Sequence, residues 1–353
     1  MGLFLDEYLG KKILVTGHTG FKGTWLSRIL VLAGARVYGL SLQAEKNSLF
    51  SEIDNLGLEE NSIIDLRDFN DLYSYFVKHK FDGIFHLAAQ PLVIESYRKP
   101  VETFQTNVMG TAHLLQAVLK NNSSNWVVIS TTDKVYKNNG KSKGYSENDL
   151  LGGEDPYSAS KSATEMVINA WSNLALLTSP MIKFVSARSG NVIGGGDTAQ
   201  NRLVPDLIRN FHAQTKTLIR NPKAIRPWQH VLDPLNGYLT IGRKLMSREM
   251  VSDTYNFGPG KNSKITVEAI ADYACKQWHG SVGYEIDNSK VIYPEAEILW
   301  LSSKLAKKEL NWSNKLDATD AINWTINWEQ ESKIHSPLIA MDNQIYKFYG
   351  QQI

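Results

Sequence analysis

Tyr157 and Lys161 lie four residues apart, and their side chains together suggest proton transfer. Pro156 precedes them and can open a helix, because proline is accepted in the first helical turn. Residues at i and i+4 lie on one face of a helix, so the phenol and the ammonium would be neighbours. A phenol with a pKa near ~10 is a poor base at neutral pH, but an adjacent cation favours its ionised form. A tyrosine placed in this way can accept a proton from an alcohol, such as that of a sugar.

A glycine-rich turn far upstream predicts the second half of such a site, a dinucleotide cradle. Gly17, Gly20 and Gly23 have the spacing G-x-x-G-x-x-G, between a strand predicted for residues 12–16 and a helix predicted for residues 20–33. In that position, bare backbone amides and the positive end of the helix face a pyrophosphate. A simple tight turn is the alternative for the glycines alone. Combined with the tyrosine and lysine, they predict a nicotinamide enzyme.

The choice between NAD and NADP depends on the end of the second strand, predicted for residues 36–40. An acidic residue there would bind the adenosine ribose and indicate NAD. The sequence instead has Leu40-Ser41-Leu42, and no arginine follows closely to bind a 2′-phosphate, so NAD is favoured. Asp65, after the third strand, either accepts a hydrogen bond from the adenine amine or caps the next helix.

Short β-rich runs alternate with helical patterns over the first half of the chain, which is typical of βαβ units. Further strands are expected at residues 63–64, 83–87, 126–130 and 182–187, and helices at 68–79, 101–120 and from Tyr157 onward. This alternation predicts an α/β fold with a Rossmann-type, doubly wound parallel sheet.

The pattern changes after Arg188, where glycine and proline pairs interrupt regular structure. With 353 residues the chain exceeds the size at which one core usually divides, so a second, smaller lobe is expected. We predict an NAD-binding Rossmann domain at residues 1–188, with a return near 230–250, and a mainly C-terminal α/β substrate lobe at 189–353. Helices are expected there at 266–278, 303–310 and 318–328, and no element is predicted after residue 331.

Composition restricts the partners. The net charge of +2 does not call for nucleic acid or an anionic membrane, so the partner is expected to be a small molecule. A single cysteine, Cys275, excludes an internal disulfide framework and suits a reducing compartment. The sequence has no recognisable signal peptide and no apolar run near the ~18 residues of a membrane span. A cytoplasmic location is therefore expected.

Landmarks spread over nearly the whole chain give it a recognisable family pattern. The chain resembles the extended short-chain dehydrogenase/reductases that act on nucleotide sugars. The landmarks are Thr16-Gly17-x-x-Gly20-Phe21-x-Gly23, Asp65-Leu66, His86-Leu87-Ala88-Ala89-Gln90, Asn107, Ser130-Thr131-Thr132-Asp133, Tyr157-x-x-x-Lys161 and Arg188-x-x-Asn191-Val192.

The segment Thr132-Asp133-Lys134 makes the resemblance more specific, because it points to the hexose 4,6-dehydratases. Many hexose 4,6-dehydratases carry Thr-Asp-Glu at this place, whereas the CDP-glucose 4,6-dehydratase family carries Thr-Asp-Lys. Longer sequence segments are also similar to that family: residues 18–25, Ala89-Gln90-Pro91-Leu92-Val93, Gly194-Gly195-Gly196-Asp197 and residues 226–231. One departure is Ile94, where that family usually has an arginine near the sugar or pyrophosphate.

The resemblance implies NAD as cofactor and a CDP-glucose-like nucleotide hexose as substrate, in deoxysugar biosynthesis of the kind that serves lipopolysaccharide O-antigen. The implied NAD-binding residues are Gly17, Thr19, Gly20, Phe21, Lys22, Gly23, Asp65, Leu66, Leu87, Ala88, Ala89, Asn107, Ser130, Tyr157 and Lys161. The expected substrate-binding residues are Gln90, Thr132, Arg188, Asn191, Arg202, Leu203, Arg226 and Gln229. No metal is expected, because no cluster has metal-ligand spacing. A homodimer through the 101–120 and 157–171 helices is expected, as in related enzymes.

These residues can be combined into a dehydration. Thr132 would hydrogen-bond the 4-hydroxyl while Tyr157, supported by Lys161, removes its proton and the nicotinamide accepts hydride from C4. The resulting ketone acidifies the C5 hydrogen. Asp133 would then protonate the departing 6-hydroxyl if burial keeps its carboxyl protonated, and Lys134 would take the C5 proton. The structural alternative is that Asp133 and Lys134 only cap the end of a strand.

Two other functional classes remain open. An NAD-dependent epimerase or reductase of the same fold would keep Tyr157 and Lys161 but would have no use for an acid and a base beside Thr132. A non-catalytic dinucleotide sensor would be expected to lack the tyrosine or the lysine, and both are present. The sequence therefore favours a hydro-lyase.

Overall fold

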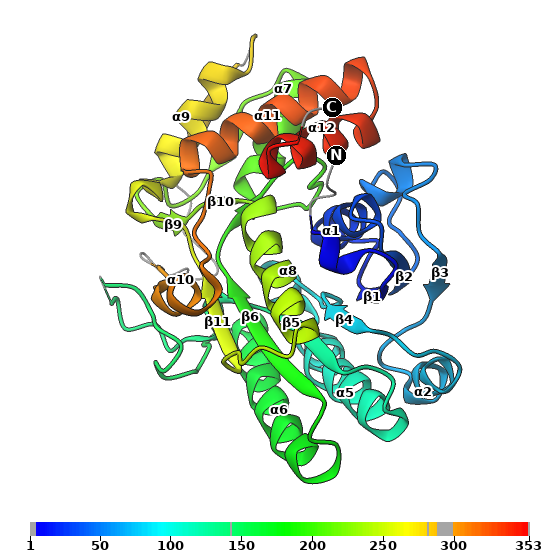
Figure 1. Cartoon of the computed structure of the whole chain (residues 1–353). Helices are drawn as coiled ribbons and strands as arrows, with labels where there is room; N and C mark the ends of the chain where they lie inside the picture. The colour runs from blue at the N-terminus through cyan, green and yellow to red at the C-terminus, as the bar shows by residue number, and fades with distance from the viewer. Residues whose placement is uncertain (1–4, 142, 281, 288–298, 352–353) are drawn as a thin grey trace.

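The computed structural model describes residues 5–141, 143–280, 282–287 and 299–351, and a seven-stranded parallel sheet lies at its centre (Figure 1). From edge to edge the strands are β11 (Thr254–Phe257), β6 (Lys183–Ser189), β5 (Trp126–Thr132), β4 (Gly83–His86), β1 (Lys12–Thr16), β2 (Arg36–Ser41) and β3 (Glu60–Ile63). Every neighbouring pair is parallel. The chain reverses its direction of travel across the sheet between β1 and β4, which opens a crevice at their carboxyl ends. The predicted doubly wound fold is confirmed.

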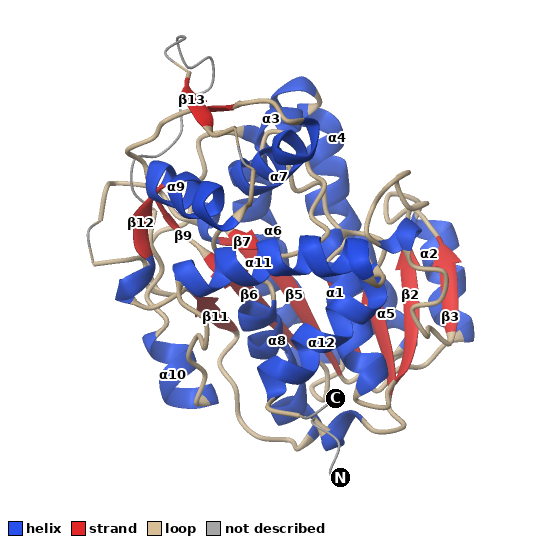
Figure 2. Cartoon of the chain, turned by 90° about the horizontal axis from the view of Figure 1, so that it is seen from above, coloured by secondary structure: helices blue, strands red, loops and turns tan. Residues whose placement is uncertain are grey.

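Helices cover both faces of the sheet, as Figures 1 and 2 show. One layer contains α2 (Phe69–Lys78), α5 (Gly110–Asn121) and α6 (Pro156–Thr178), whose apolar residues share a core with β4 and β5. The other contains α1 (Phe21–Leu32), α8 (Leu232–Met246) and α12 (Pro337–Tyr349). Burial on both faces explains why the central strands β1, β4 and β5 contain apolar runs.

The helix predicted for residues 101–120 is interrupted. It consists of α4 (Pro100–Phe104), a π-helical turn η3 (Gln105–Met109) and α5, and the short helix α3 (Val93–Arg98) precedes it. Such π-turns often occur at functional sites. This one contains Asn107, which is buried and contacts α6. No periodicity signal distinguishes a π-turn from the α-helix around it.

A smaller lobe has its own apolar core. Its elements include α7 (Leu203–Ala213), β8 (Thr217–Ile219), β9 (Ile225–Pro227), β12 (Lys264–Thr266), α9 (Val267–Gln277), β13 (Tyr284–Ile286) and α11 (Ala318–Ile334). The remaining elements are β7 (Val192–Ile193), β10 (Gln229–His230), α10 (Lys304–Leu310), η1 (Asp6–Tyr8), η2 (Phe50–Glu52), η4 (Asp133–Val135) and η5 (Lys261–Ser263). Two stretches after residue 188, 232–257 and 304–349, contribute to the core beside the sheet.

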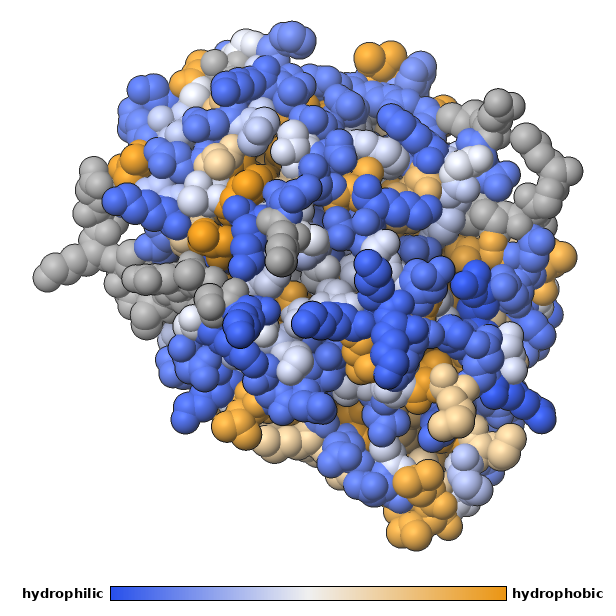
Figure 3. Space-filling view, turned by 60° about the vertical axis from the view of Figure 1, so that its left-hand side comes forward, coloured by the Kyte–Doolittle hydropathy of each residue, from blue (hydrophilic) through white to orange (hydrophobic). Residues whose placement is uncertain are grey.

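Helix α12 was missed from the sequence, although its boundaries carry clear signals. The Ser336 side chain accepts from the Ile339 N–H, Pro337 opens the helix, and Gly350 ends it with φ 70°. Met341 and Ile345 on its inner face are fully buried in the core beside α1. On the face seen in Figure 3, hydrophilic side chains predominate and apolar ones form scattered patches, one of them at the lower edge. Among the described helices, none is both long and apolar enough to cross a membrane.

Candidate active site

The turn after β1 forms a backbone cradle. Gly17 has φ +73°, and an ideal Cβ there would lie 2.7 Å from the backbone nitrogen of Ala88. A Cβ on Gly23 would lie 2.0 Å from the Gly17 carbonyl oxygen, so neither position accepts a side chain. Gly20 precedes α1 without a side-chain cap, which leaves the first-turn N–H groups available to an anion. These features fit the pyrophosphate of a dinucleotide.

The outer end of this cradle is built from hydroxyl groups. The Thr19 Oγ1 lies 2.7 Å from the Ser41 Oγ at the end of β2.

Asp65 accepts hydrogen bonds from the Arg67 guanidinium and from the Arg67 backbone N–H. Helix α2 is capped by Asp68, so the capping alternative for Asp65 is wrong. Contact of Asp65 with adenine stays a prediction.

Tyr157 and Lys161 lie in the first two turns of α6, where Asp155 caps the helix by accepting from the Ser158 N–H. Both side chains are buried, and the Lys161 Nζ donates to the Ser130 carbonyl at the end of β5 (3.3 Å). Burial raises the pKa of Tyr157 to about 12, against the lowering effects of a Thr132 hydrogen bond and the Arg202 charge. Burial therefore outweighs the lowering by these two neighbours, and a lowering by the Lys161 charge stays a prediction.

A second lysine, Lys22, reaches the same place from α1. Its Nζ donates to the Tyr238 hydroxyl (2.8 Å), to the Ser130 Oγ (3.2 Å) and to the Ser189 Oγ (3.3 Å). Burial, together with the charge of Lys22, lowers the pKa of Lys161 to about 8. Sequence reasoning missed Tyr238 and Ser189, because no local pattern connects them to residues so far away in the chain.

Thr132, Asp133 and Lys134 follow one another at the carboxyl end of β5. The Thr132 Oγ1 donates to the Asp133 Oδ1 (3.0 Å), and the Lys134 Nζ donates to the same oxygen (3.3 Å). Asp133 is fully buried, and its Oδ2 has no hydrogen-bond partner in the described structure. A buried carboxyl oxygen without a partner is costly unless a ligand completes it. A hydroxyl donor, a carboxyl and an amine thus meet beside Tyr157.

The interior behind this site contains an ion pair between α6 and β6. The Arg188 guanidinium makes two hydrogen bonds to Glu165 and also donates to the Tyr136 hydroxyl and the Glu147 carbonyl. Burial alone would raise the pKa of Glu165, but Arg188 holds it below its ordinary value. The prediction that Arg188 binds substrate is not supported, because its guanidinium is committed to the protein interior. Glu165, four residues after Lys161, could have been found from the i, i+4 spacing.

Gln90 and Asn107 join the β4 loop to α6. The Asn107 Oδ1 accepts from the Gln90 N–H, and its Nδ2 donates to the Gln90 carbonyl and to the Ser160 Oγ. The Gln90 side chain donates to the Thr103 hydroxyl. These bonds fix the loop that begins with Leu87, Ala88 and Ala89, next to the cradle.

The other predicted substrate residues lie around the smaller lobe. Arg202 pairs with Asp197 (3.2 Å), and its charge acts on Tyr157; Leu203 begins α7 directly after it. Arg226 is buried in β9, and the Asn191 carbonyl accepts from the backbone N–H of Gln229. The Gln229 side chain is buried and donates to the Phe257 carbonyl. Within the described ranges, no group of three or more His, Cys, Asp or Glu could hold a metal ion.

Comparison with known proteins agrees with this geometry. Residues 14–325 match the family model described as GDP-mannose 4,6-dehydratase. The CDP-glucose 4,6-dehydratase of Salmonella typhimurium is 41% identical over 327 residues, covering 91% of each chain. The chain belongs to this dehydratase family.

Proteins of lower sequence identity also match nearly the whole chain. The UDP-glucose 4-epimerase of Erwinia amylovora is 26% identical and covers 91% of this chain and 98% of its own. The dTDP-glucose 4,6-dehydratase of Streptomyces venezuelae, solved with NAD bound, superposes with a TM-score of 0.75 at 22% identity, covering 93% of this chain and 99% of its own. The UDP-glucose 4-epimerase of Thermotoga maritima gives a TM-score of 0.78 at 21% identity, covering 92% and 100%.

Removal of the Arg188 charge tests whether the ion pair with Glu165 stabilises the folded protein. Arg188→Leu should lower the free energy of unfolding by about 3–5 kcal/mol, because it leaves the buried Glu165 carboxylate unpaired. Urea denaturation measures this change. The control Arg209→Leu, which breaks the exposed pair with Asp206, should cost less than about 1 kcal/mol. Unchanged stability with loss of nucleotide-sugar binding would instead assign Arg188 to the substrate.

Proposed function

We propose that the protein is an NAD-dependent 4,6-dehydratase that converts CDP-glucose to CDP-4-keto-6-deoxyglucose and water. The observation that carries this proposal is the placement of Asp133 and Lys134 next to Thr132, beside the buried Tyr157. A simple C4 oxidation or epimerisation needs the tyrosine but neither of those two groups. The 41% identical CDP-glucose 4,6-dehydratase supports the choice of reaction and of substrate.

When bound, NAD would supply the hydride acceptor for oxidation at C4 of the hexose and the hydride donor for reduction at C6. The turn from Gly17 to Gly23 would hold its pyrophosphate, since this backbone has no room for side chains. Thr19, Asp65 and Leu66 would surround the adenosine, while Phe21, Lys22, the 87–89 loop, Asn107 and Ser130 would line the path to the nicotinamide. We assign residues 1–188 to this NAD-binding domain and 189–353 mainly to the nucleotide sugar, with the 232–257 stretch returning to the sheet.

Tyr157 carries the first proton transfer. It removes the proton from the 4-hydroxyl, while the Thr132 hydroxyl binds the same oxygen. Burial opposes ionisation of the phenol, so nearby positive charge and hydrogen bonds must favour the phenolate. Arg202 and Thr132 do so in this structure, and Lys161 adds its charge when its ammonium is protonated.

Asp133 and Lys134 divide the elimination between them. The 4-ketone acidifies the C5 hydrogen, which Lys134 removes as a proton, while Asp133 gives its proton to the departing 6-hydroxyl so that water leaves. When C6 then receives hydride, the Lys134 ammonium returns a proton to C5. The two groups touch at the Asp133 Oδ1, whereas the Oδ2 is buried and unpartnered. That oxygen is therefore the one available to the 6-hydroxyl.

Substrate binding draws on both lobes. Arg226 would pair with the pyrophosphate of the nucleotide, because a guanidinium matches phosphate oxygens. Gln90, Asn191, Arg202, Leu203 and Gln229 would complete the contacts to the sugar and nucleotide. Cytidine is chosen on the likeness to the Salmonella enzyme. We propose a cytoplasmic location, because a single cysteine suits a reducing compartment.

Incubation of the purified protein with CDP-glucose and NAD tests the proposal. The expected product is CDP-4-keto-6-deoxyglucose, formed without net NADH, because the hydride returns to the same sugar. Product NMR and absorbance at 340 nm measure these two quantities. A C4 epimer, or NADH in stoichiometric amounts, would instead favour the epimerase or reductase alternative.

Two variants should separate the half-reactions. Tyr157→Phe should remove C4 oxidation, whereas Lys134→Ala should retain it and slow water loss by roughly 10²–10⁴-fold, the usual contribution of a general base. Single-turnover NADH formation reports the oxidation, and release of deuterium from [5-²H]CDP-glucose reports the elimination. Lys137→Ala, an exposed lysine three residues on, is the control. If Lys134→Ala slows both steps equally, the division of roles is wrong.

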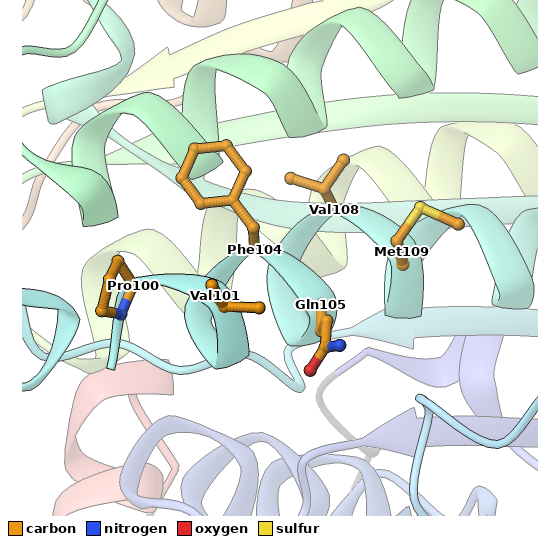
Figure 4. Close-up of a pocket in the computed structure, with 6 residues that line it drawn as sticks. All are labelled: Pro100, Val101, Phe104, Gln105, Val108 and Met109. Atoms are coloured by element: carbon orange, nitrogen blue, oxygen red, sulfur yellow. The ribbon is translucent and has the colours of Figure 1, made fainter. Parts of the chain in front are cut away.

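We also propose that the enzyme is a homodimer. An apolar hollow of about 390 Å³ lies on α4 and η3, lined by Pro100, Val101, Phe104, Gln105, Val108 and Met109 (Figure 4). Val101 (70% exposed), Met109 (49%) and Met166 on α6 (61%) are large apolar side chains in solvent, and α4 contacts α6. A symmetric partner presenting the same helices would cover them.

Charge introduced into this surface should prevent the association. Val101→Asp and Met166→Asp should each reduce the mass measured by light scattering from that of a dimer to that of a monomer. Met250→Asp, which alters a 98% exposed residue elsewhere, should leave the mass unchanged. A monomeric wild-type protein, or dimeric variants at micromolar concentration, would exclude this interface.

A further inference from the structure

Two lysine ammonium groups meet at a single residue, Ser130. The Lys161 Nζ donates to the Ser130 carbonyl oxygen (3.3 Å), and the Lys22 Nζ donates to the Ser130 Oγ (3.2 Å). The lysines come from different helices, α6 and α1, which approach opposite faces of β5. Like charges this close inside a protein repel each other.

The Lys22 ammonium is held by hydroxyl groups. The Tyr238 hydroxyl accepts from it at 2.8 Å and also lies 3.1 Å from the Ser130 Oγ and 3.0 Å from the Ser189 Oγ. The Lys22 charge also lies 4.8 Å from the centre of the Tyr238 ring. Hydroxyl groups and an aromatic face orient a cation without neutralising it. No carboxylate forms an ion pair with Lys22 among the described residues.

The groups around Lys161 otherwise offset one another. Glu165, one turn further along α6, attracts the ammonium, but its own charge is compensated by Arg188. His86, in β4, lies between two threonine hydroxyls and is neutral at ordinary pH, because burial lowers its pKa to about 3. Tyr157 is a further titratable neighbour, and in the proposed reaction its phenolate is the group that the Lys161 charge stabilises. Lys22 is thus the one uncompensated charge among these neighbours.

We propose that Lys22 is a positioning residue for the reaction: its ammonium, fixed by Ser130, Ser189 and Tyr238, repels that of Lys161 and so sets the upper pH limit of C4 oxidation. This inference rests on the proposed function, in which a charged Lys161 supports the Tyr157 phenolate. As pH rises, Lys161 loses its proton earlier than an isolated lysine would, and that support disappears. Burial and the charge of Lys22 act on Lys161 in the same direction.

A matched pair of variants isolates the charge. Lys22→Met keeps the length of the side chain and removes the cation, whereas Lys22→Arg keeps the cation. In single-turnover C4 oxidation at saturating NAD and sugar, the alkaline limb of the rate should shift upward by about one pH unit in Lys22→Met, as expected for loss of one nearby like charge. It should stay in place in Lys22→Arg. If the alkaline limb of the rate lies at the same pH in the wild type and in Lys22→Met, the proposal is wrong.

A second measurement does not depend on activity. The pKa of Lys161 is lower in the folded than in the unfolded protein, so the unfolded state binds more protons between about pH 8 and the ordinary lysine pKa of ~10.4. Through this group, stability therefore rises with pH across that window. Urea denaturation should show a smaller rise in Lys22→Met than in Lys22→Arg. An equal rise in the two variants would overturn the charge coupling, even if the protein proved to have no dehydratase activity.

Discussion

A buried ammonium, that of Lys161, is the constraint on which the rest of the site depends. Removing a charge from water is costly, and this one lies behind a tyrosine that burial already makes less acidic. A carbonyl at the end of β5 and a carboxylate one helical turn away favour the charge. A second cation, Lys22, is held at a fixed place by hydroxyl groups and opposes it. The basicity of the pair is therefore set by several elements together.

The sheet brings these elements together. Strands β4, β5 and β6 end side by side, so the loop before Gln90, the Thr132-Asp133-Lys134 segment and Ser189 face one crevice. The Glu165–Arg188 pair fastens α6 to β6 behind it, and Thr131 and Ser186 donate to the same carboxylate. An ion pair enclosed in this way is a poor source of stability but a strong constraint on geometry. Its value to the enzyme is that Tyr157 and Thr132 are held in one arrangement.

Sequence reasoning succeeded where a local pattern reflects a local cause. Strand β1 and helix α1 are within a residue or so of their predicted limits, because apolar runs and a glycine turn determine them. It failed where the partner is distant or the irregularity is subtle. Arg188 reads as a phosphate ligand until its carboxylate partner is seen, and the π-turn around Asn107 has the same periodicity as a helix. Helix α12 was missed although Ser336, Pro337 and Gly350 mark its ends.

The sequence alone determined the fold class, the glycine cradle, the tyrosine and lysine pair and the family pattern, since each consists of short stretches whose residues are close together in the chain. The tertiary structure decided which charges meet. Lys22 reaches Tyr238 across 216 positions, and Arg188 turns inward to Glu165 rather than outward to a ligand. Charge interactions act through space and depend on burial, and both become known only when the strands and helices are packed.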